Sequence, residues 1–157
     1  MRAMLKGHKH SVHDVAFSPN GHSLVSASAD HSARIWNLRD GSSKVLPVTG
    51  SPSVFSCVVF SPDGRYVAGG NLNGMLWIWD SRTHRLVTKW QGRANNPVWC
   101  TKFTPGGKGL VSCSDKTVQY WDVSSLGNRQ GVSMRTEESG FPLVRNFVGH
   151  NVHSLLL

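Results

Sequence analysis

The first residues whose types could do chemistry are a histidine, a serine and an aspartate near the start of the chain. His8, Ser26 and Asp30 are the three types of a nucleophilic triad, in which histidine takes the serine proton and aspartate orients the histidine. The same three types can also form a structural hydrogen-bond network. The elements that carry these side chains must decide between the two interpretations.

A histidine cluster at the same end suggests a metal site. His8, His10 and His13 lie within six residues, and imidazole is a common zinc ligand. Strand alternation would send neighbouring side chains to different faces, and no Cys, Asp or Glu at a suggestive spacing completes the set. We therefore expect no metal and interpret the cluster as part of a polar loop rim. The glycine-rich segment 69–74 lacks the Lys-Ser/Thr of a phosphate loop, so it predicts a turn, and we expect no cofactor.

An internal repeat specifies the elements that position these residues. Phe17, Phe60 and Phe103 lie 43 positions apart, each in the pattern Phe-Ser/Thr-Pro-x-Gly. Each copy then reaches a tryptophan followed by Asn or Asp, at Trp36-Asn37, Trp79-Asp80 and Trp121-Asp122. Self-similarity at a period of this length is the signature of a repeat architecture.

Each copy also predicts four strands, because short alternating or β-branched runs are bounded by Pro, Gly, Asn and Asp. The fold class is therefore all-β. The expected strands are 12–17, 24–27, 33–37 and 43–47 in the first copy, 54–60, 66–69, 75–79 and 86–90 in the second, and 98–103, 110–113, 118–122 and 143–147 in the third.

With Gly7-His8 at its front, the repeat resembles the WD40 pattern over nearly the whole chain. The resemblance implies a partial β-propeller of three four-stranded blades, with repeats at about 7–47, 50–91 and 92–148. Because propellers typically need about 4–8 blades to close, we expect an open arc that associates through exposed blade edges. We expect incomplete blades at both ends, since 3–5 lies where a preceding outer strand belongs and a fourth copy at 149–157 stops early. Residues 123–142 predict an exposed, mobile loop insert.

The WD40 resemblance also implies a structural role for the residues of the first paragraph. His8, Ser26, Asp30 and Trp36 match a buried hydrogen-bonded tetrad of that family. Such a network explains the three polar residues better than a nucleophilic triad does. No catalytic residue is therefore assigned, and we expect the chain not to be an enzyme.

The tetrad is complete in one copy only. The equivalent residues of the second copy are Ser51, Gly69 and Asn73, so most of the network is lost together. Joint loss is favoured because stranding one buried partner costs about 1–3 kcal/mol. In the third copy Arg93 lies near the histidine position, and we expect it to pair with Asp115.

Propellers of this family usually bind partners with the loops of one rim. By this resemblance, the loops entering the first strand and those between the second and third strands form a partner-binding rim. It is basic and aromatic, which suits an acidic or peptide partner. Its residues are Lys9, His10, His13, His31, Phe55, Arg93, Asn95 and Trp99.

Composition limits the remaining classes. The formal net charge is +8, but the basic residues are dispersed, and we expect no sequence-specific nucleic-acid binding. Cys57, Cys100 and Cys113 contain no Cys-x-x-Cys and predict free thiols in a reducing compartment. We see no signal peptide and no apolar stretch long enough for a membrane span. We therefore expect a nuclear or cytoplasmic protein that does not contact membranes.

A narrower resemblance lies mainly in residues 105–150. The run from Gly106 to Leu126, the long insert and Phe147-Val-Gly-His150 look like late blades of fungal Tup-type transcriptional corepressors. That resemblance implies a nuclear scaffold that docks DNA-bound repressors and chromatin components. Two alternatives remain open: another WD40 scaffold, of the G-protein β-like or sensor-associated kind, and a truncated fragment without independent function.

Overall fold

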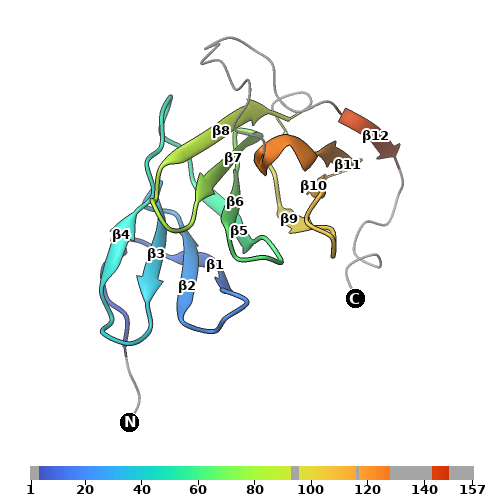
Figure 1. Ribbon diagram of the computed structural model, residues 1–157. Coiled ribbons are helices and arrows are strands. Elements are labelled where there is room, and N and C mark those ends of the chain that lie inside the picture. Colours follow the sequence, from blue (N-terminus) through green and yellow to red (C-terminus); the bar gives the residue numbers. More distant parts are fainter. Residues whose placement is uncertain (1–3, 93–95, 116, 128–142, 149–157) are drawn as a thin grey trace.

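The structure is a computed structural model that describes residues 4–92, 96–115, 117–127 and 143–148, the last range in backbone only. These residues form three four-stranded antiparallel sheets (Figure 1). The first sheet contains β1 (Val12–Phe17), β2 (Ser23–Ser28), β3 (Ala33–Asn37) and β4 (Ser43–Val45). The second contains β5 (Phe55–Phe60), β6 (Tyr66–Asn71), β7 (Met75–Asp80) and β8 (Leu86–Gln91). The third contains β9 (Cys100–Phe103), β10 (Gly109–Ser114), β11 (Thr117–Asp122) and β12 (Leu143–Val148).

Every predicted strand is present, and each of its ends lies within two residues of the predicted position. The first hairpin of each sheet turns at the Pro-containing motif, where Gly21, Gly64 and Gly107 have φ of 70°, 71° and 68°. Only glycine adopts this left-handed conformation without steric cost. The motif therefore fixes the hairpin at the same place in all three copies.

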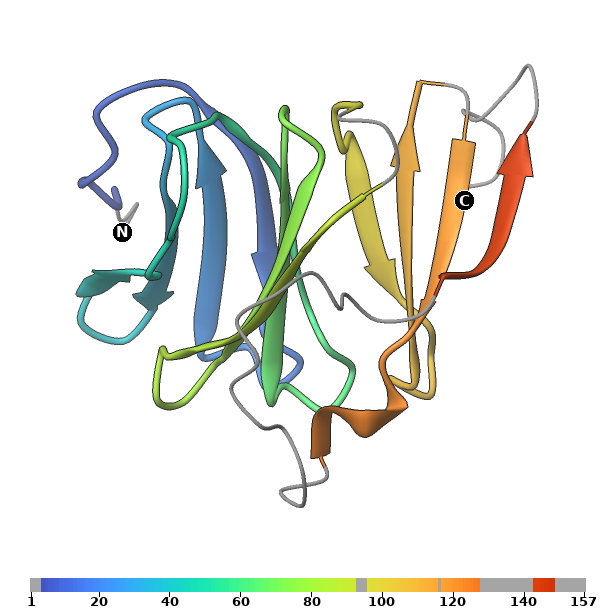
Figure 2. The ribbon, with the colours of Figure 1, turned by 90° about the horizontal axis from the view of Figure 1, so that it is seen from above.

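The three sheets lie side by side, with β1, β5 and β9 as neighbouring edge strands (Figure 2). The middle sheet contributes to two cores because its side chains alternate between its faces. Trp77 and Trp79 pack with Val25 of the first sheet, whereas Leu76 and Ile78 belong to the core shared with the third sheet. Apolar burial between sheets thus helps to hold neighbouring repeats together, and so do hydrogen bonds such as that from the backbone N–H of Val58 on β5 to Asp14 Oδ2 on β1.

The outer face of the first sheet has no neighbouring sheet among the described residues. Phe17 on β1 is 65% exposed, whereas its repeat equivalent Phe60 is 7% exposed against the first sheet. Val15 and Val58 differ in the same way, at 52% and 3%. The sheets do not close into a ring, and the predicted all-β, partial-propeller fold is confirmed.

Two predictions about the loops need correction. The insert predicted as exposed from residue 123 begins with a buried residue, because Val123 packs in the core between the second and third sheets. A short 3₁₀ helix, η2 (Ser124–Gly127), follows, and the hydroxyl of Tyr66 donates to the carbonyl of Leu126. Residues 128–142 of the insert lie outside the described residues, as does the start of the fourth copy at 149–157.

The prediction of an outer strand at 3–5 is not supported, because Met4 and Leu5 have no strand conformation and Ala3 lies outside the described residues. The prediction of three free thiols is wrong. Cys100 and Cys113 are directly paired across β9 and β10 and form a disulfide, with their Cα atoms 5.3 Å apart. Cys57 is free and buried, and burial raises its pKa to about 12.

Candidate binding site on the loop rim

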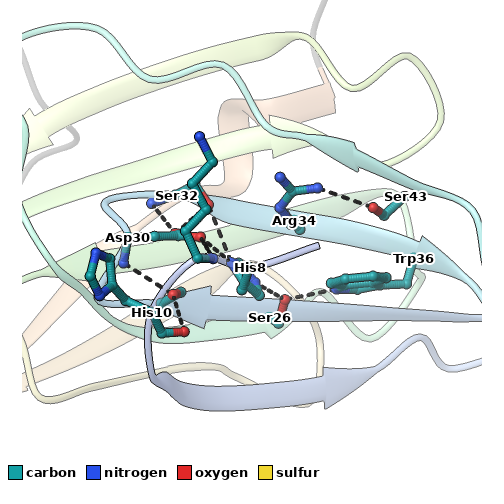
Figure 3. A network of polar contacts seen from close by, with 10 residues as sticks. His8, His10, Ser26, Asp30, Ser32, Arg34, Trp36 and Ser43 are labelled. Atoms are coloured by element: carbon teal, nitrogen blue, oxygen red, sulfur yellow. Dashed lines mark hydrogen bonds and ion pairs between the residues drawn. The ribbon is translucent and has the colours of Figure 1, made fainter. Parts of the chain in front are cut away.

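A hydrogen-bonded network ties the segment before β1 to the first sheet (Figure 3). His8 contacts Asp30 through Nδ1 at 2.8 Å and Ser26 Oγ through Nε2 at 2.6 Å. The indole Nε1 of Trp36 donates to the same Ser26 oxygen at 2.7 Å. All four predicted tetrad residues are therefore joined, and they connect a loop, two strands and a turn.

The strands bring these groups together in a defined way. Ser26 on β2 lies opposite Arg34 on β3. Trp36 comes two residues after Arg34, so its side chain lies on the same face of the sheet. Asp30 lies in the turn between β2 and β3, where it also accepts hydrogen bonds from the hydroxyl of Ser32 and the backbone N–H of Lys9. The turn thus anchors the loop that carries the histidine.

The contacts also define how protons are placed in the network. The indole N–H can only donate, so Ser26 Oγ accepts from Trp36. In a neutral His8 the proton lies on Nδ1, which faces the Asp30 carboxylate, so Nε2 is the acceptor and takes the hydrogen bond of the Ser26 hydroxyl. His8 Nδ1–H then donates to Asp30. Burial would raise the pKa of Asp30, but hydrogen bonds from Ser32, Lys9 and His8 outweigh burial and hold that pKa well below its usual range.

The order serine, histidine, aspartate is that of a catalytic triad, but this serine is not placed to attack a substrate. Ser26 is 2% exposed, and its oxygen already accepts the indole hydrogen of Trp36. A nucleophile needs a free lone pair and access to the substrate. The geometry therefore favours the structural network.

In the second sheet, the tryptophan at the equivalent position has a different hydrogen-bond acceptor. Trp79 Nε1 donates at 2.7 Å to the carbonyl oxygen of Pro47, in the loop after the first sheet. Its ring lies over Gly69, where a Cβ atom would be 3.0 Å from the ring atom Cζ3. The tryptophan therefore occupies space that the serine side chain fills in the first copy.

The third sheet keeps one bond of the network, from Trp121 Nε1 to Ser112 Oγ at 2.9 Å. Asp115 accepts a hydrogen bond of 2.5 Å from the indole of Trp99, and its pairing with Arg93 stays a prediction. Arg93 lies outside the described residues, and sequence reasoning missed the Trp99 contact. Both residues of that contact do lie in rim loops, which was the available signal.

Asn37, Asp80 and Asp122 have one local role at the opposite end of the sheets. Each follows the tryptophan of its copy, and its Oδ1 accepts a hydrogen bond from the backbone N–H two residues further on. This side-chain to backbone bond is an Asx turn. It ends the third strand of each sheet and plays no part in the rim.

The loop rim consists of the loops that enter β1, β5 and β9 together with the turns β2–β3, β6–β7 and β10–β11. Of its predicted members, those that the structure describes as exposed are Lys9, His10, His13, His31 and Trp99. Arg93 and Asn95 lie outside the described residues. Phe55 was wrongly included, because it is fully buried and packs on Trp77 with ring centroids 4.9 Å apart.

A bulge near the start of the first strand of a sheet explains which rim side chains point outward. The register shifts at His13 in β1 and at Ser56 in β5, and Trp99 lies at the equivalent position before β9. A bulge re-aims the side chain it carries. His13 and Trp99 are exposed, whereas the hydroxyl of Ser56 donates to the carbonyl of Val98 in the loop that enters β9.

The histidines of the rim are not arranged as a metal site. His8 uses both ring nitrogens in the tetrad, and His10 and His13 are exposed. Among the residues that the structure describes, no group of three or more His, Cys, Asp or Glu side chains is placed to hold a metal ion. Among the predicted rim residues that the structure describes as exposed, the chemistry is that of one lysine, three imidazoles and the large aromatic side chain of Trp99, which the rim carboxylate of Asp115 holds.

Comparison with known families decides what the repeat is. The model of the WD40 family, described as "WD domain, G-beta repeat", matches residues 1–37, 43–80 and 84–122. The chain belongs to the WD40 family. Each matched segment ends at the residue after the tetrad-position tryptophan. A WD40 repeat of this chain is therefore offset from the sheets by one strand, because 43–80 contains β4 of the first sheet with β5 to β7, and 84–122 contains β8 of the second sheet with β9 to β11.

Relatives of this WD40 chain serve different processes. Pre-mRNA-processing factor 19 of Dictyostelium discoideum is 26% identical over 82% of this chain and 25% of that protein. The small ribosomal subunit protein RACK1y of rice (Oryza sativa subsp. japonica) is 30% identical over 76% of this chain and 35% of that protein. Nuclear distribution protein PAC1-2 of Uncinocarpus reesii is 32% identical over 78% of this chain and 31% of that protein. The chain thus spans about a quarter to a third of these relatives.

Solved structures show the same fold. The structure of U3-55K has a TM-score of 0.77 and 24% identity, covering 92% of this chain and 41% of that one. The structure of the RRP9 WD40 repeats has the same TM-score and identity, covering 93% of this chain and 41% of that one. Among the described residues of this WD40 chain, no helix is long and apolar enough to cross a membrane.

Proposed function

We propose that this WD40 chain is a non-catalytic scaffold that binds other proteins through its loop rim. The observation that carries the proposal is Trp99, which is 51% exposed while its indole is held by Asp115. An aromatic side chain with a fixed orientation loses little entropy on binding, and such residues dominate interface energies. Trp99 is therefore the proposed anchor for a partner.

The charge of the rim supports an acidic partner segment. Lys9 is an exposed cation, and His10 and His31 are exposed hydrogen-bonding groups, whereas the carboxylates of Asp30 and Asp115 are already engaged by the tetrad and by Trp99. Complementary charge steers association and selects partners. We therefore propose an acidic or peptide segment as the bound element.

A role as an enzyme has no support from the geometry around Ser26. Its buried oxygen serves Trp36 and His8, and both contacts would have to break before it could attack a substrate. A screen against ester and peptide substrates tests this proposal. Turnover that Ser26→Ala abolishes without unfolding the chain would contradict it.

The finer proposal is a corepressor-like role with DNA-bound repressors or chromatin components as partners, acting in the nucleus. It is supported by the sequence resemblance in residues 105–150, whereas the relatives above serve splicing, ribosomal and nuclear-distribution roles. Tethering the chain to a DNA-binding domain upstream of a reporter tests it. We expect repression that Trp99→Ala removes, and an unchanged reporter would contradict the corepressor role while leaving the scaffold role standing.

The scaffold role itself is tested by cross-linking the chain to partners in cell extract. We expect Trp99→Ala to lose the partners that the wild-type chain captures. Arg82→Ala is the matched control, because Arg82 is exposed in the β7–β8 turn at the opposite end of the sheets. Equal capture by both variants would contradict a role for the loop rim.

A further inference from the structure

A pocket of about 510 Å³ with a mixed polar and apolar lining lies at the rim end of the second sheet. This volume is in the range of about 300–1,000 Å³ typical of ligand pockets. It is formed by the loop before β5, the β6–β7 turn and the neighbouring strands. The lining residues that the argument uses are Thr49, Gly50, Ser51, Met75, Trp77 and Lys89.

The pocket lies where the second copy has lost its tetrad histidine. Ser51 stands at the repeat position of His8, and its short side chain does not reach across to the sheet as the imidazole does. The preceding glycines show the same difference. A Cβ atom at Gly7 would lie 3.0 Å from the side chain of Arg34, whereas one at Gly50 would meet only Lys89 Nζ, at 3.8 Å. The loop therefore stands further from the second sheet than from the first.

Two residues that line the pocket carry hydrogen-bond donors with unused capacity. The Nε1 atom of Trp77 is buried without a hydrogen-bond partner, and such a group costs about 1–3 kcal/mol. Among the described residues, the ammonium of Lys89 donates to one acceptor, the carbonyl oxygen of Thr49 at 3.2 Å, although it has three hydrogens to give. None of the described residues that line the pocket is acidic.

We propose that this pocket binds a carboxylate, namely the acidic side chain of a partner protein. The inference rests on the scaffold role proposed above and names the chemistry of a second contact. A single carboxylate has one negative charge and several lone pairs, which match one lysine and one indole N–H. A phosphate group carries more charge than one cation balances. Lys89 supplies the attraction, and Trp77 supplies the deeper donor.

Binding requires a small rearrangement, because Trp77 Nε1 is covered in the unliganded chain. Met75 lines the pocket, is only partly buried and packs against the core that contains Trp77. Its flexible thioether chain can move at low cost. The carboxylate then gives up hydrogen bonds to water and accepts hydrogen bonds from the indole N–H and the ammonium.

The experiment follows the indole N–H signals of the whole chain by NMR during titration with acetyl-Gly-Glu-Gly-amide at constant ionic strength. Trp77→Phe assigns the Trp77 signal. We expect a saturable shift of that signal, with at least fivefold weaker binding of the neutral acetyl-Gly-Gln-Gly-amide. A third titration with acetyl-glycinate shows whether a chain-end carboxylate is accepted as well as a side chain.

Three variants test the site. Lys89→Gln should weaken binding of the glutamate peptide at least fivefold. Ser51→His, which restores the residue of the first copy, should block that binding. The matched control Lys44→Gln, an exposed lysine on β4, should leave binding unchanged. The proposal is overturned if the shift does not saturate, if both peptides bind equally, or if Lys89→Gln behaves like Lys44→Gln. Because Trp99 is not involved, loss of this site leaves the capture experiment with Trp99→Ala as an independent result.

Discussion

The indole Nε1 of Trp79 donates a 2.7 Å hydrogen bond to the carbonyl oxygen of Pro47, and this bond links the second sheet to the loop that follows the first. The equivalent tryptophan, Trp36, donates to Ser26 within its own sheet. The repeat keeps the tryptophan and changes its acceptor. A backbone carbonyl from the neighbouring blade replaces the hydroxyl that Gly69 does not provide.

This relationship predicts that Gly69→Ser destabilises the chain, although it restores the serine of the first copy. The new Cβ would lie 3.0 Å from the Trp79 ring and displace it from Pro47. We expect a loss of roughly 1–3 kcal/mol in the free energy of unfolding, as for other overpacked sites, measured by urea denaturation. Gly106→Ser is the control, because no atom lies within 4 Å of a Cβ there. Equal stability of the two variants would contradict the account.

In the first sheet the opposite change, Ser26→Ala, should also be costly. It strands two buried groups, the indole N–H of Trp36 and Nε2 of His8. At about 1–3 kcal/mol for each stranded group, we expect a loss of roughly 3 kcal/mol in the free energy of unfolding. Ser112→Ala strands Trp121 alone and should cost about half as much. Equal losses in the two variants would show that His8 adds nothing to the network.

The tetrad should also make stability depend on pH. Hydrogen bonds hold the pKa of Asp30 in the folded chain well below its ordinary value of 3.8. A lowered folded-state pKa adds stability that is present above the unfolded-state value and is lost as pH falls below it. The difference in unfolding free energy between the wild-type chain and Asp30→Asn should therefore shrink from pH 6 to pH 2. A difference that stays constant over this range would contradict the assignment.

The strands were predictable because each copy has the same spacing of turn residues and alternating apolar side chains, and turns such as that at Gly21 need a particular backbone conformation. The tetrad was predictable because His8, Ser26, Asp30 and Trp36 keep the spacing of the family pattern. These features are local. They follow from residue types that, at these spacings, favour few backbone conformations.

Other features were not predictable because they depend on neighbouring sheets. The bulge at Ser56 shifts the side-chain alternation of β5, so Phe55 turns into the core and away from the rim. The disulfide joins Cys100 to Cys113 only because the register of β9 and β10 places them opposite each other. The bond between Trp79 and Pro47 depends on how two blades pack.

The uncovered face of β1 predicts self-association of this 157-residue chain. Phe17 is 65% exposed at a position where the second sheet buries Phe60 against its neighbour, and exposed blade faces favour association. Sedimentation velocity over a concentration series should show association that Phe17→Ser weakens at least tenfold. Leu38→Ser removes another exposed apolar side chain, in the β3–β4 turn, and should have little effect. A wild-type chain that stays monomeric throughout the series would contradict the prediction.

The central claim, binding of a partner protein at the loop rim, is tested most directly by hydrogen exchange of the chain with and without a partner captured from extract. We predict slower exchange in segments 9–13 and 96–99 and in the β2–β3 turn that contains His31, because these segments surround the proposed contact. The turns at 18–22 and 61–65, at the opposite end of the sheets, should exchange at unchanged rates. Protection confined to those opposite turns, with none at the rim, would contradict the account.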